Sequence, residues 1–159
     1  MNIRLVLRIL GIFLILLAGI MIIPLLWALH FGEPLRCFLI PILATAAAGA
    51  AIYLSCRNAS GELYPKEGFA IVGLGRILSS VFGALPYLTS GTFSSFPDAY
   101  FETMSGFTTT GASVMTNIEA SYKCILFWRS LTHWLGGMGI IVLFVAVFPF
   151  LGVGGRYLL

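Results

Sequence analysis

The sequence predicts an all-α membrane protein in which two N-terminal transmembrane helices precede one helix–pore loop–helix unit. The chain of 159 residues is 59% hydrophobic and only 9% charged. Soluble domains carry about 25% charged residues, so lipid is the expected solvent. Four apolar runs each approach or exceed the roughly 20 residues that cross a bilayer. Between the third and fourth runs lies a stretch too polar to span and too aromatic for an ordinary loop.

The first two runs form the predicted N-terminal unit, residues 1–57. The first extends from about Leu5 to Leu29, with Pro24 in its last turns as a candidate kink. Because cleavable signal segments have an apolar core of only about 7–15 residues, this run is interpreted as an uncleaved helix. The second extends from about Leu35 to Cys56, and its alanines with Gly49 form a small-residue face that lets membrane helices pack closely.

A polar loop at 58–67 leads into the predicted repeat, residues 68–159. The outer helices of the repeat are expected from about Gly68 to Leu88 and from about Cys124 to Leu151. The positive charges that flank the spans favour a cytoplasmic N-terminus, because five would then lie inside and two outside. Four spans return the C-terminus to the cytoplasm and place the 58–67 loop there too. The inside residues are Arg4, Arg8, Arg57, Lys66 and Arg156, and the outside ones are Arg36 and Lys123.

A short helix is predicted at about 96–107 within the polar stretch. Ser95 is a good N-cap, Asp98 three positions later completes a capping-box-like pattern, and Pro97 suits a first helical turn. The Thr-Thr-Thr-Gly-Ala run at 108–112 ends the helix, because β-branched residues and glycine disfavour it. Extended backbone is therefore expected over that run.

A short helix followed by extended backbone between two spans is typical of a re-entrant loop, since irregular backbone at membrane depth is tolerated only inside protein or beside water. The negative C-terminal end of the helix would favour a cation at a pore axis. Carbonyls of the loop would replace the water shell of a potassium ion. The threonine run alone also fits a polar external loop, but the order of span, short helix, loop and span favours a filter. The candidate ion-binding residues are Thr108, Thr109, Thr110, Gly111 and Ala112, with potassium assigned to the first four.

Five polar side chains nearby are candidates for supporting roles. Asp98 is expected to cap the short helix. Glu102 is expected either to bond to backbone near the loop and add negative potential, or to be solvated in an outer vestibule. Arg129 is expected either to support the pore or to place its guanidinium at the membrane–water interface. His133 is expected to pack or hydrogen-bond rather than to bind a metal. Arg76 lies inside the third run, where it either pairs with a glutamate or faces a water cavity.

Several function classes find no support in the residues. No basic cluster suits a nucleic acid. The three cysteines, Cys37, Cys56 and Cys124, lack a C-x-x-C spacing and a nearby histidine, so they are expected to be apolar fillers. No acid–base pair and no nucleophile with a partner is apparent, so neither an enzyme, nor catalytic residues, nor a covalently bound cofactor is expected.

Three segments resemble the Trk-type bacterial potassium uptake proteins, the TrkH and TrkG group that is related to KtrB. The run D-A-Y-F-E-T-M-S-G-F-T-T-T-G-A at 98–112 is similar to the first pore loop of that family. The run F-W-R-S-L-T-H-W-L-G-G-M-G at 127–139 resembles the start of the next helix, and G-A-L-P-Y at 83–87 resembles the end of the preceding one. The resemblance covers essentially the whole chain.

The resemblance implies two extra helices followed by four repeats around one pore in a single polypeptide. It implies potassium uptake across the bacterial inner membrane, by a channel-like or symport route, with K⁺ as the transported ion. It also implies membrane lipids as surroundings, pairing into dimers, and gating by a peripheral cytoplasmic subunit that binds NAD and ATP.

This sequence contains only the two extra helices and the first of the four repeats. It is interpreted as a truncated or partial member of the family. Because one loop cannot close a ring, three missing repeats or further copies of the chain are needed, and the fragment alone is expected to be inactive. The alternative is a non-conducting packing or assembly subunit.

Overall fold

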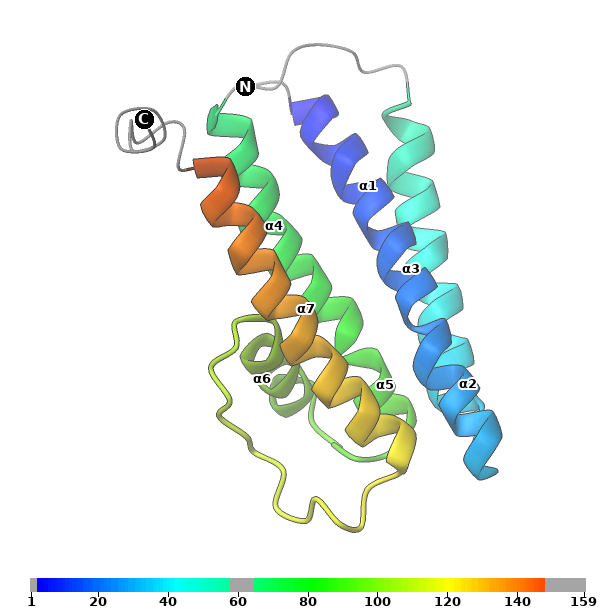
Figure 1. Cartoon of the computed structure of the whole chain (residues 1–159). Coiled ribbons are helices and arrows are strands. Elements are labelled where there is room, and N and C mark those ends of the chain that lie inside the picture. The colour runs from blue at the N-terminus through cyan, green and yellow to red at the C-terminus, as the bar shows by residue number, and fades with distance from the viewer. Residues whose placement is uncertain (1–2, 58–64, 148–159) are drawn as a thin grey trace.

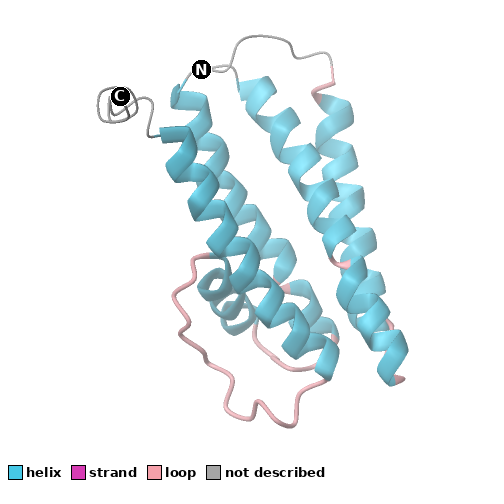
Figure 2. Ribbon diagram, viewed as in Figure 1, coloured by secondary structure: helices cyan, strands magenta, loops and turns pink. Residues whose placement is uncertain are grey.

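The protein was analysed as a computed structural model that describes residues 3–57 and 65–147, with side-chain surroundings up to position 139. The helices of this part of the chain are joined by loops, and its described residues contain no strand (Figure 2), which confirms the all-α prediction. The helices are α1 (Ile3–Ile20), α2 (Ile22–Phe31), α3 (Arg36–Ser55), α4 (Pro65–Gly83), α5 (Leu85–Thr89), α6 (Phe96–Phe107) and α7 (Lys123–Val147).

Three helical stretches in the described part are long and apolar enough to cross a membrane. They are Ile3–Phe31, Arg36–Ser55 and Lys66–Thr89, with mean hydropathies of 3.0, 2.1 and 1.7. They correspond to the first three predicted spans. Helix α7 has 25 residues and is therefore about 37 Å long. It covers most of the fourth predicted span, whose end at 148–151 lies outside the described residues, so that span stays a prediction.

The first span is interrupted between α1 and α2. Pro24 has no N–H to donate to the carbonyl four residues earlier. The regular helix is therefore interrupted at Met21. The backbone bonds on either side persist, because Met21 donates to the Leu17 carbonyl at 3.0 Å and Leu25 donates to that of Met21 at 3.3 Å. The helix is therefore interrupted three residues before the proline, about two-thirds of the way along the first span and just before the last turns in which the kink was expected.

Helices α1 and α3 pack most closely where two glycines face each other. A Cβ atom on Gly11 would lie 2.8 Å from the Tyr53 nitrogen and 2.9 Å from the Gly49 carbonyl oxygen. A Cβ atom on Gly49 would in turn lie 2.9 Å from the Gly11 carbonyl oxygen. Neither position has room for a side chain, so the small-residue face expected around Gly49 is a backbone-to-backbone contact.

Short helix α6 lies against α4 and α7 near one end of the molecule (Figure 1). The fully buried Trp128 of α7 anchors this arrangement, because its indole N–H donates to the Gly83 carbonyl at 3.0 Å. Its ring meets those of Phe107 and Phe38 edge-on, with centroids 6.5 Å and 6.2 Å away. A Cβ atom on Gly83 would lie 2.7 Å from a methyl carbon of Thr103. Glycine therefore allows α4 to approach α6.

The α2–α3 turn holds the beginning of α7. The Glu33 carboxylate accepts the backbone N–H groups of Lys123 at 2.7 Å and Cys124 at 2.9 Å. Although burial opposes ionisation of Glu33, these two backbone hydrogen bonds and the charge of Lys123 lower its pKa. Trp27 also stacks on Phe127, with ring centroids 4.9 Å apart. The N-terminal helices are thus tied to the repeat at this end.

Candidate functional site

The first turn of α6 differs in one respect from the predicted capping box. Ser95 takes the extended backbone conformation of an N-cap, but its side chain makes no capping hydrogen bond. The capping-box hydrogen bond was therefore a wrong prediction. Pro97 lies in the first turn as expected, and Asp98 is exposed there, where a negative charge interacts favourably with the helix dipole.

The last turn of α6 closes with a Schellman motif. Thr110 donates its backbone N–H to the Ser105 carbonyl at 3.0 Å, and Thr109 donates to that of Gly106 at 2.9 Å. Thr108 is still right-handed, with φ −93° and ψ −1°, while Thr109 is left-handed with φ +58°. Extended backbone was therefore wrong at these two residues, because the helix closes on itself before the chain leaves it.

Thr109 is an unusual residue for the left-handed position of this motif, which glycine normally occupies. A left-handed conformation costs a side chain with a Cβ atom about 1–2 kcal/mol, and a β-branched residue is a genuine outlier there. Gly111 follows with φ +78°, as expected for a glycine that allows unusual dihedrals. Along 108–111 the sign of φ thus alternates between negative and positive.

The loop is exposed on one side and held to α6 on the other. Residues 109–112 are exposed in this chain, and Thr108 is half-buried. The Thr108 hydroxyl donates to the Met104 carbonyl at 2.8 Å, so the 2.8 Å contact between the Thr108 and Thr110 hydroxyls uses the proton of Thr110. The Ser105 hydroxyl donates to the Ala112 carbonyl at 2.6 Å. Both ends of the loop are therefore fixed to the helix that precedes it.

Glu102 is the centre of a buried polar network behind the loop. Its side chain is 1% exposed, and its carboxylate accepts the Arg129 Nε–H at 2.6 Å. It also accepts the Ser113 hydroxyl at 2.9 Å and the Val114 backbone N–H at 3.0 Å. Of the two expectations for Glu102, the geometry matches hydrogen bonding near the loop rather than solvation. Arg129 is an ion-pair partner here, and is 24% exposed.

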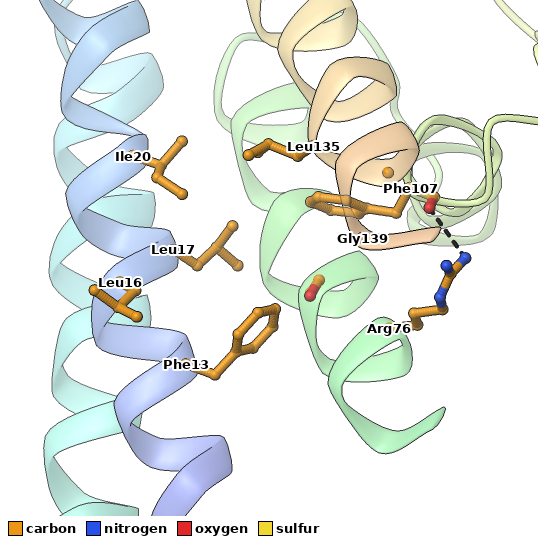
Figure 3. A pocket seen from close by; sticks show the side chains of 10 residues that line it. Phe13, Leu16, Leu17, Ile20, Arg76, Phe107, Leu135 and Gly139 are labelled. Atoms are coloured by element: carbon orange, nitrogen blue, oxygen red, sulfur yellow. Dashed lines mark hydrogen bonds between the residues drawn. The ribbon is translucent and has the colours of Figure 1, made fainter. Parts of the chain in front are cut away.

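His133 and Arg76 also bind backbone carbonyls. Because a carbonyl only accepts, His133 Nδ1 carries the proton that it shares with the Arg129 carbonyl at 2.9 Å. Arg76 donates from Nη1 to the Phe107 carbonyl at 3.2 Å rather than pairing with a glutamate (Figure 3). It also lines a cavity of about 230 Å³, whose other lining residues are mostly apolar. Helix α1 covers one side of this cavity, with Phe13, Leu16, Leu17 and Ile20 (Figure 3).

Sequence reasoning missed three residues that hold the site. Ser105 and Ser113 look like ordinary small polar residues, and only their contacts with Ala112 and Glu102 reveal their roles. Glu33 lies in the short segment between the first two predicted spans, yet it binds the backbone of a residue 90 positions away. A serine one turn before the threonine run was the one signal available. The three cysteines are buried, in keeping with the expectation that they fill apolar space.

Comparison with known proteins identifies the family. The family model for TrkH, described as a cation transport protein, matches residues 35–159. The chain belongs to this family. It is 44% identical over 161 residues to the Trk system potassium uptake protein TrkH of Escherichia coli K12, and 42% identical over 160 residues to that of Halomonas elongata. The resemblance found in the sequence is thereby confirmed.

A solved structure extends the family assignment to the fold. The potassium transporter TrkH from Vibrio parahaemolyticus matches with a TM-score of 0.89 at 38% identity, over 99% of this chain and 34% of that chain. The two curated relatives are likewise covered over only 33% of their length. The chain therefore spans about a third of the proteins that it matches. As a member of a transporter family with three apolar helices in its described part, it is a membrane protein.

Proposed function

We propose that this chain supplies one quarter of a potassium filter in a Trk-type uptake system of the bacterial inner membrane. One observation carries the proposal: an exposed loop of alternating backbone conformation follows directly on the C-terminus of a short helix wedged between α4 and α7. The relatives are named for potassium uptake, which supports K⁺ as the transported ion. No covalent chemistry is needed for this function, so no catalytic residue is assigned.

The backbone of the loop suits ion coordination. Alternation between right- and left-handed residues turns successive N–H groups to one side of the chain and leaves successive carbonyls on the other. Carbonyls arranged in this way replace the hydration shell of a dehydrating potassium ion. The carbonyls of residues 108–111 are the proposed ligands. The Ala112 carbonyl accepts the Ser105 hydroxyl at 2.6 Å, so Ala112 also anchors the loop to α6.

The polar network behind the loop keeps the filter in place. Glu102 connects α6 to the loop segment that follows the filter through Ser113 and Val114, and connects both to α7 through Arg129. His133 and Asp98 support the two flanking elements, α7 and the first turn of α6. Rigid surroundings matter because a filter discriminates ions only while its carbonyls stay near their coordinating positions.

The complete filter needs more than this chain. We propose that three further repeats, or further copies, complete the ring around the open side of 108–112. The N- and C-termini and the 58–67 loop face the cytoplasm, and residues 1–57 form a peripheral helix pair beside the first repeat, residues 68–159. The name of the relatives refers to a system, which supports further subunits. A cytoplasmic NAD- and ATP-binding regulator and a homodimer are the proposed partners.

A second candidate function follows from the coverage of about a third of each relative. A single loop cannot surround an ion, so the chain by itself would act as a non-conducting packing or assembly subunit. Both candidates predict no potassium flux into liposomes that contain only the 159-residue chain. They differ in whether a substitution in the loop at 108–112 abolishes uptake by a chimera that contains the rest of a relative.

A chimera tests the filter directly. The chain replaces the matching third of the Escherichia coli relative, and the chimera is expressed in a strain that cannot take up potassium. Gly111→Arg should abolish growth at low potassium, because it fills the open face of the loop. Gly91→Arg is the matched control, since Gly91 also has positive φ, at +75°, and nothing lies within 4 Å of a Cβ atom at either position. Equal growth and equal membrane amounts for both variants would refute the filter assignment.

A further inference from the structure

Arg76 carries a charge at a depth that requires a polar partner. It lies 10 residues after the beginning of the span Lys66–Thr89 and 13 before its end. At 1.5 Å per residue these separations are about 15 Å and about 20 Å. An arginine at the centre of a membrane helix is costly and marks a functional position by default. Its side chain is only half-buried and faces the end of α6 (Figure 3).

The partner of Arg76 is the one carbonyl in the last turn of α6 without a backbone N–H partner. The last four carbonyls of a helix have no partner within the helix. Three of them accept N–H groups of the C-cap and the loop that follows, at 2.9–3.0 Å: Met104 from Thr108, Gly106 from Thr109 and Ser105 from Thr110. The fourth, Phe107, accepts Arg76 Nη1 at 3.2 Å. The peptide that enters the filter is therefore held from α4.

Helix α7 encloses the same carbonyl from another side. A Cβ atom on Gly136 would lie 2.5 Å from the Phe107 oxygen and 2.8 Å from that of Gly106. The backbone of α7 therefore blocks that approach, and Arg76 supplies the hydrogen bond. Apart from Arg76 and Ser79, the cavity beside this contact is lined by apolar residues and glycines. Its low polarity strengthens the interaction of the guanidinium with nearby charges and dipoles.

We propose that Arg76 is a positioning residue of the filter that also weakens cation binding at its inner end. The hydrogen bond fixes the Phe107–Thr108 peptide, and the charge opposes the partial negative charge at the C-terminus of α6. This inference rests on the proposed filter. An ion leaves a pore only if it is not held too tightly, so a fixed positive charge at the inner end favours release.

Three substitutions in the chimera separate the two roles of Arg76. Arg76→Lys keeps the charge and a donor, Arg76→Gln keeps a donor without the charge, and Arg76→Met keeps neither. Initial rates of potassium uptake are measured against external potassium, with sodium uptake alongside. Arg76→Gln should lower the apparent KM several-fold, whereas Arg76→Lys should stay close to the parent chimera. Arg76→Met should in addition reduce the preference for potassium over sodium.

Hydrogen exchange of the purified chimeras gives a readout that is independent of transport. The amides of Thr108, Thr109 and Thr110 should exchange faster in Arg76→Met than in Arg76→Lys, because the end of α6 is released. If Arg76→Gln and Arg76→Lys both match the parent in KM, selectivity and exchange while Gly111→Arg abolishes uptake, the inference about Arg76 is wrong and the filter stands. If Gly111→Arg leaves uptake intact, the filter proposal itself fails. Should Arg76→Met not accumulate, Arg76→Gln and Arg76→Lys still decide whether the charge of Arg76 weakens cation binding.

Discussion

Helices α2 and α6 end in the same hydrogen-bonded motif with different residues at its left-handed position. In α2 that residue is Gly32, with φ +67°, and Glu33 donates its N–H to the Ala28 carbonyl at 2.9 Å. In α6 it is Thr109, with φ +58°. Glycine adopts this conformation without steric cost, whereas a threonine is strained by about 1–2 kcal/mol. The same geometry is thus reached without strain at one end and with strain at the other.

The two helix ends also differ in what the side chain at the left-handed position contacts. The α2 end connects two spans, and its left-handed residue, Gly32, contributes only backbone to the turn. The α6 end carries a side chain that hydrogen-bonds within the loop, because the Thr109 hydroxyl donates to the Thr108 carbonyl at 2.7 Å. Strained residues cluster at functional sites, where the surrounding structure fixes them in place. In α6 the fixing elements are Ser105, Arg76 and the Glu102 network.

The largest expected effect comes from removing the buried acid that holds the α6 end. Glu102→Gln leaves the Arg129 guanidinium without a charged partner beside a buried site. Breaking a fully buried ion pair costs about 3–5 kcal/mol, and the lower end of that range applies here because Arg129 is 24% exposed and can be hydrated. We expect a decrease of that order in the free energy of unfolding, measured in detergent by chemical denaturation.

The control is Glu33→Gln, which alters an acid next to the α2 end that lies nearer the surface. It should cost much less than Glu102→Gln. Similar losses for the two variants would show that the α6 end is no more dependent on buried charge than the α2 end.

Alanine substitutions at Gly111 and Gly32, which both have positive φ, test the comparison between the α6 and α2 ends. Gly111→Ala and Gly32→Ala meet no atom within 4 Å of the new Cβ, so their cost comes from the positive φ alone. Each should destabilise the fold by about 1–2 kcal/mol. Only Gly111→Ala should reduce potassium uptake by the chimera, because Gly32 lies away from the proposed filter. An equal loss of uptake in both variants would mean that uptake follows stability rather than loop geometry.

Most of the fold was predictable because it depends on local properties of the sequence. The long apolar runs predicted four membrane helices, three of which are confirmed in the described residues. A short run with N-cap and first-turn residue types predicted a helix at the position of α6, Phe96–Phe107. The alanine-rich face with Gly49 predicted close packing that the structure shows against Gly11. These features require only periodicity, length and residue size.

The details of the site depended on contacts that no local pattern contains. Propensity alone predicts extended backbone for three threonines, yet Thr109 is left-handed because the Schellman motif overrides its preference. Arg76 donates a hydrogen bond to the carbonyl of a residue 31 positions later in the sequence. Glu33 accepts one from the first residue of α7, which lies 90 positions later. A sequence shows that such charged residues need partners, whereas only the fold shows which partners they have.

A smaller effect is expected when the strain at the α6 end is removed. Thr109→Gly relieves about 1–2 kcal/mol of strain but adds unfolded-state entropy worth about 0.5–1 kcal/mol. The net result should be a stabilisation of about 0–1.5 kcal/mol, with a lower preference of the chimera for potassium over sodium because the loop is freer. Thr110→Gly is the control, since Thr110 does not have a positive φ. It should destabilise, and a stabilisation of the same size would remove the evidence for strain at Thr109.

The smallest effect concerns the acid next to the α2 end and depends on pH. The pKa of Glu33 is lowered because backbone hydrogen bonds from Cys124 and Lys123, with the charge of Lys123, outweigh its burial. A carboxylate with a lowered pKa contributes stability that is complete above its unfolded pKa of about 4.3 and is lost as pH falls through the folded value. Unfolding of the chain in detergent between pH 7 and pH 3 should therefore show an acid-dependent loss that is smaller in Glu33→Gln. Parallel pH curves for the two proteins would mean that Glu33 does not hold α7 through its charge.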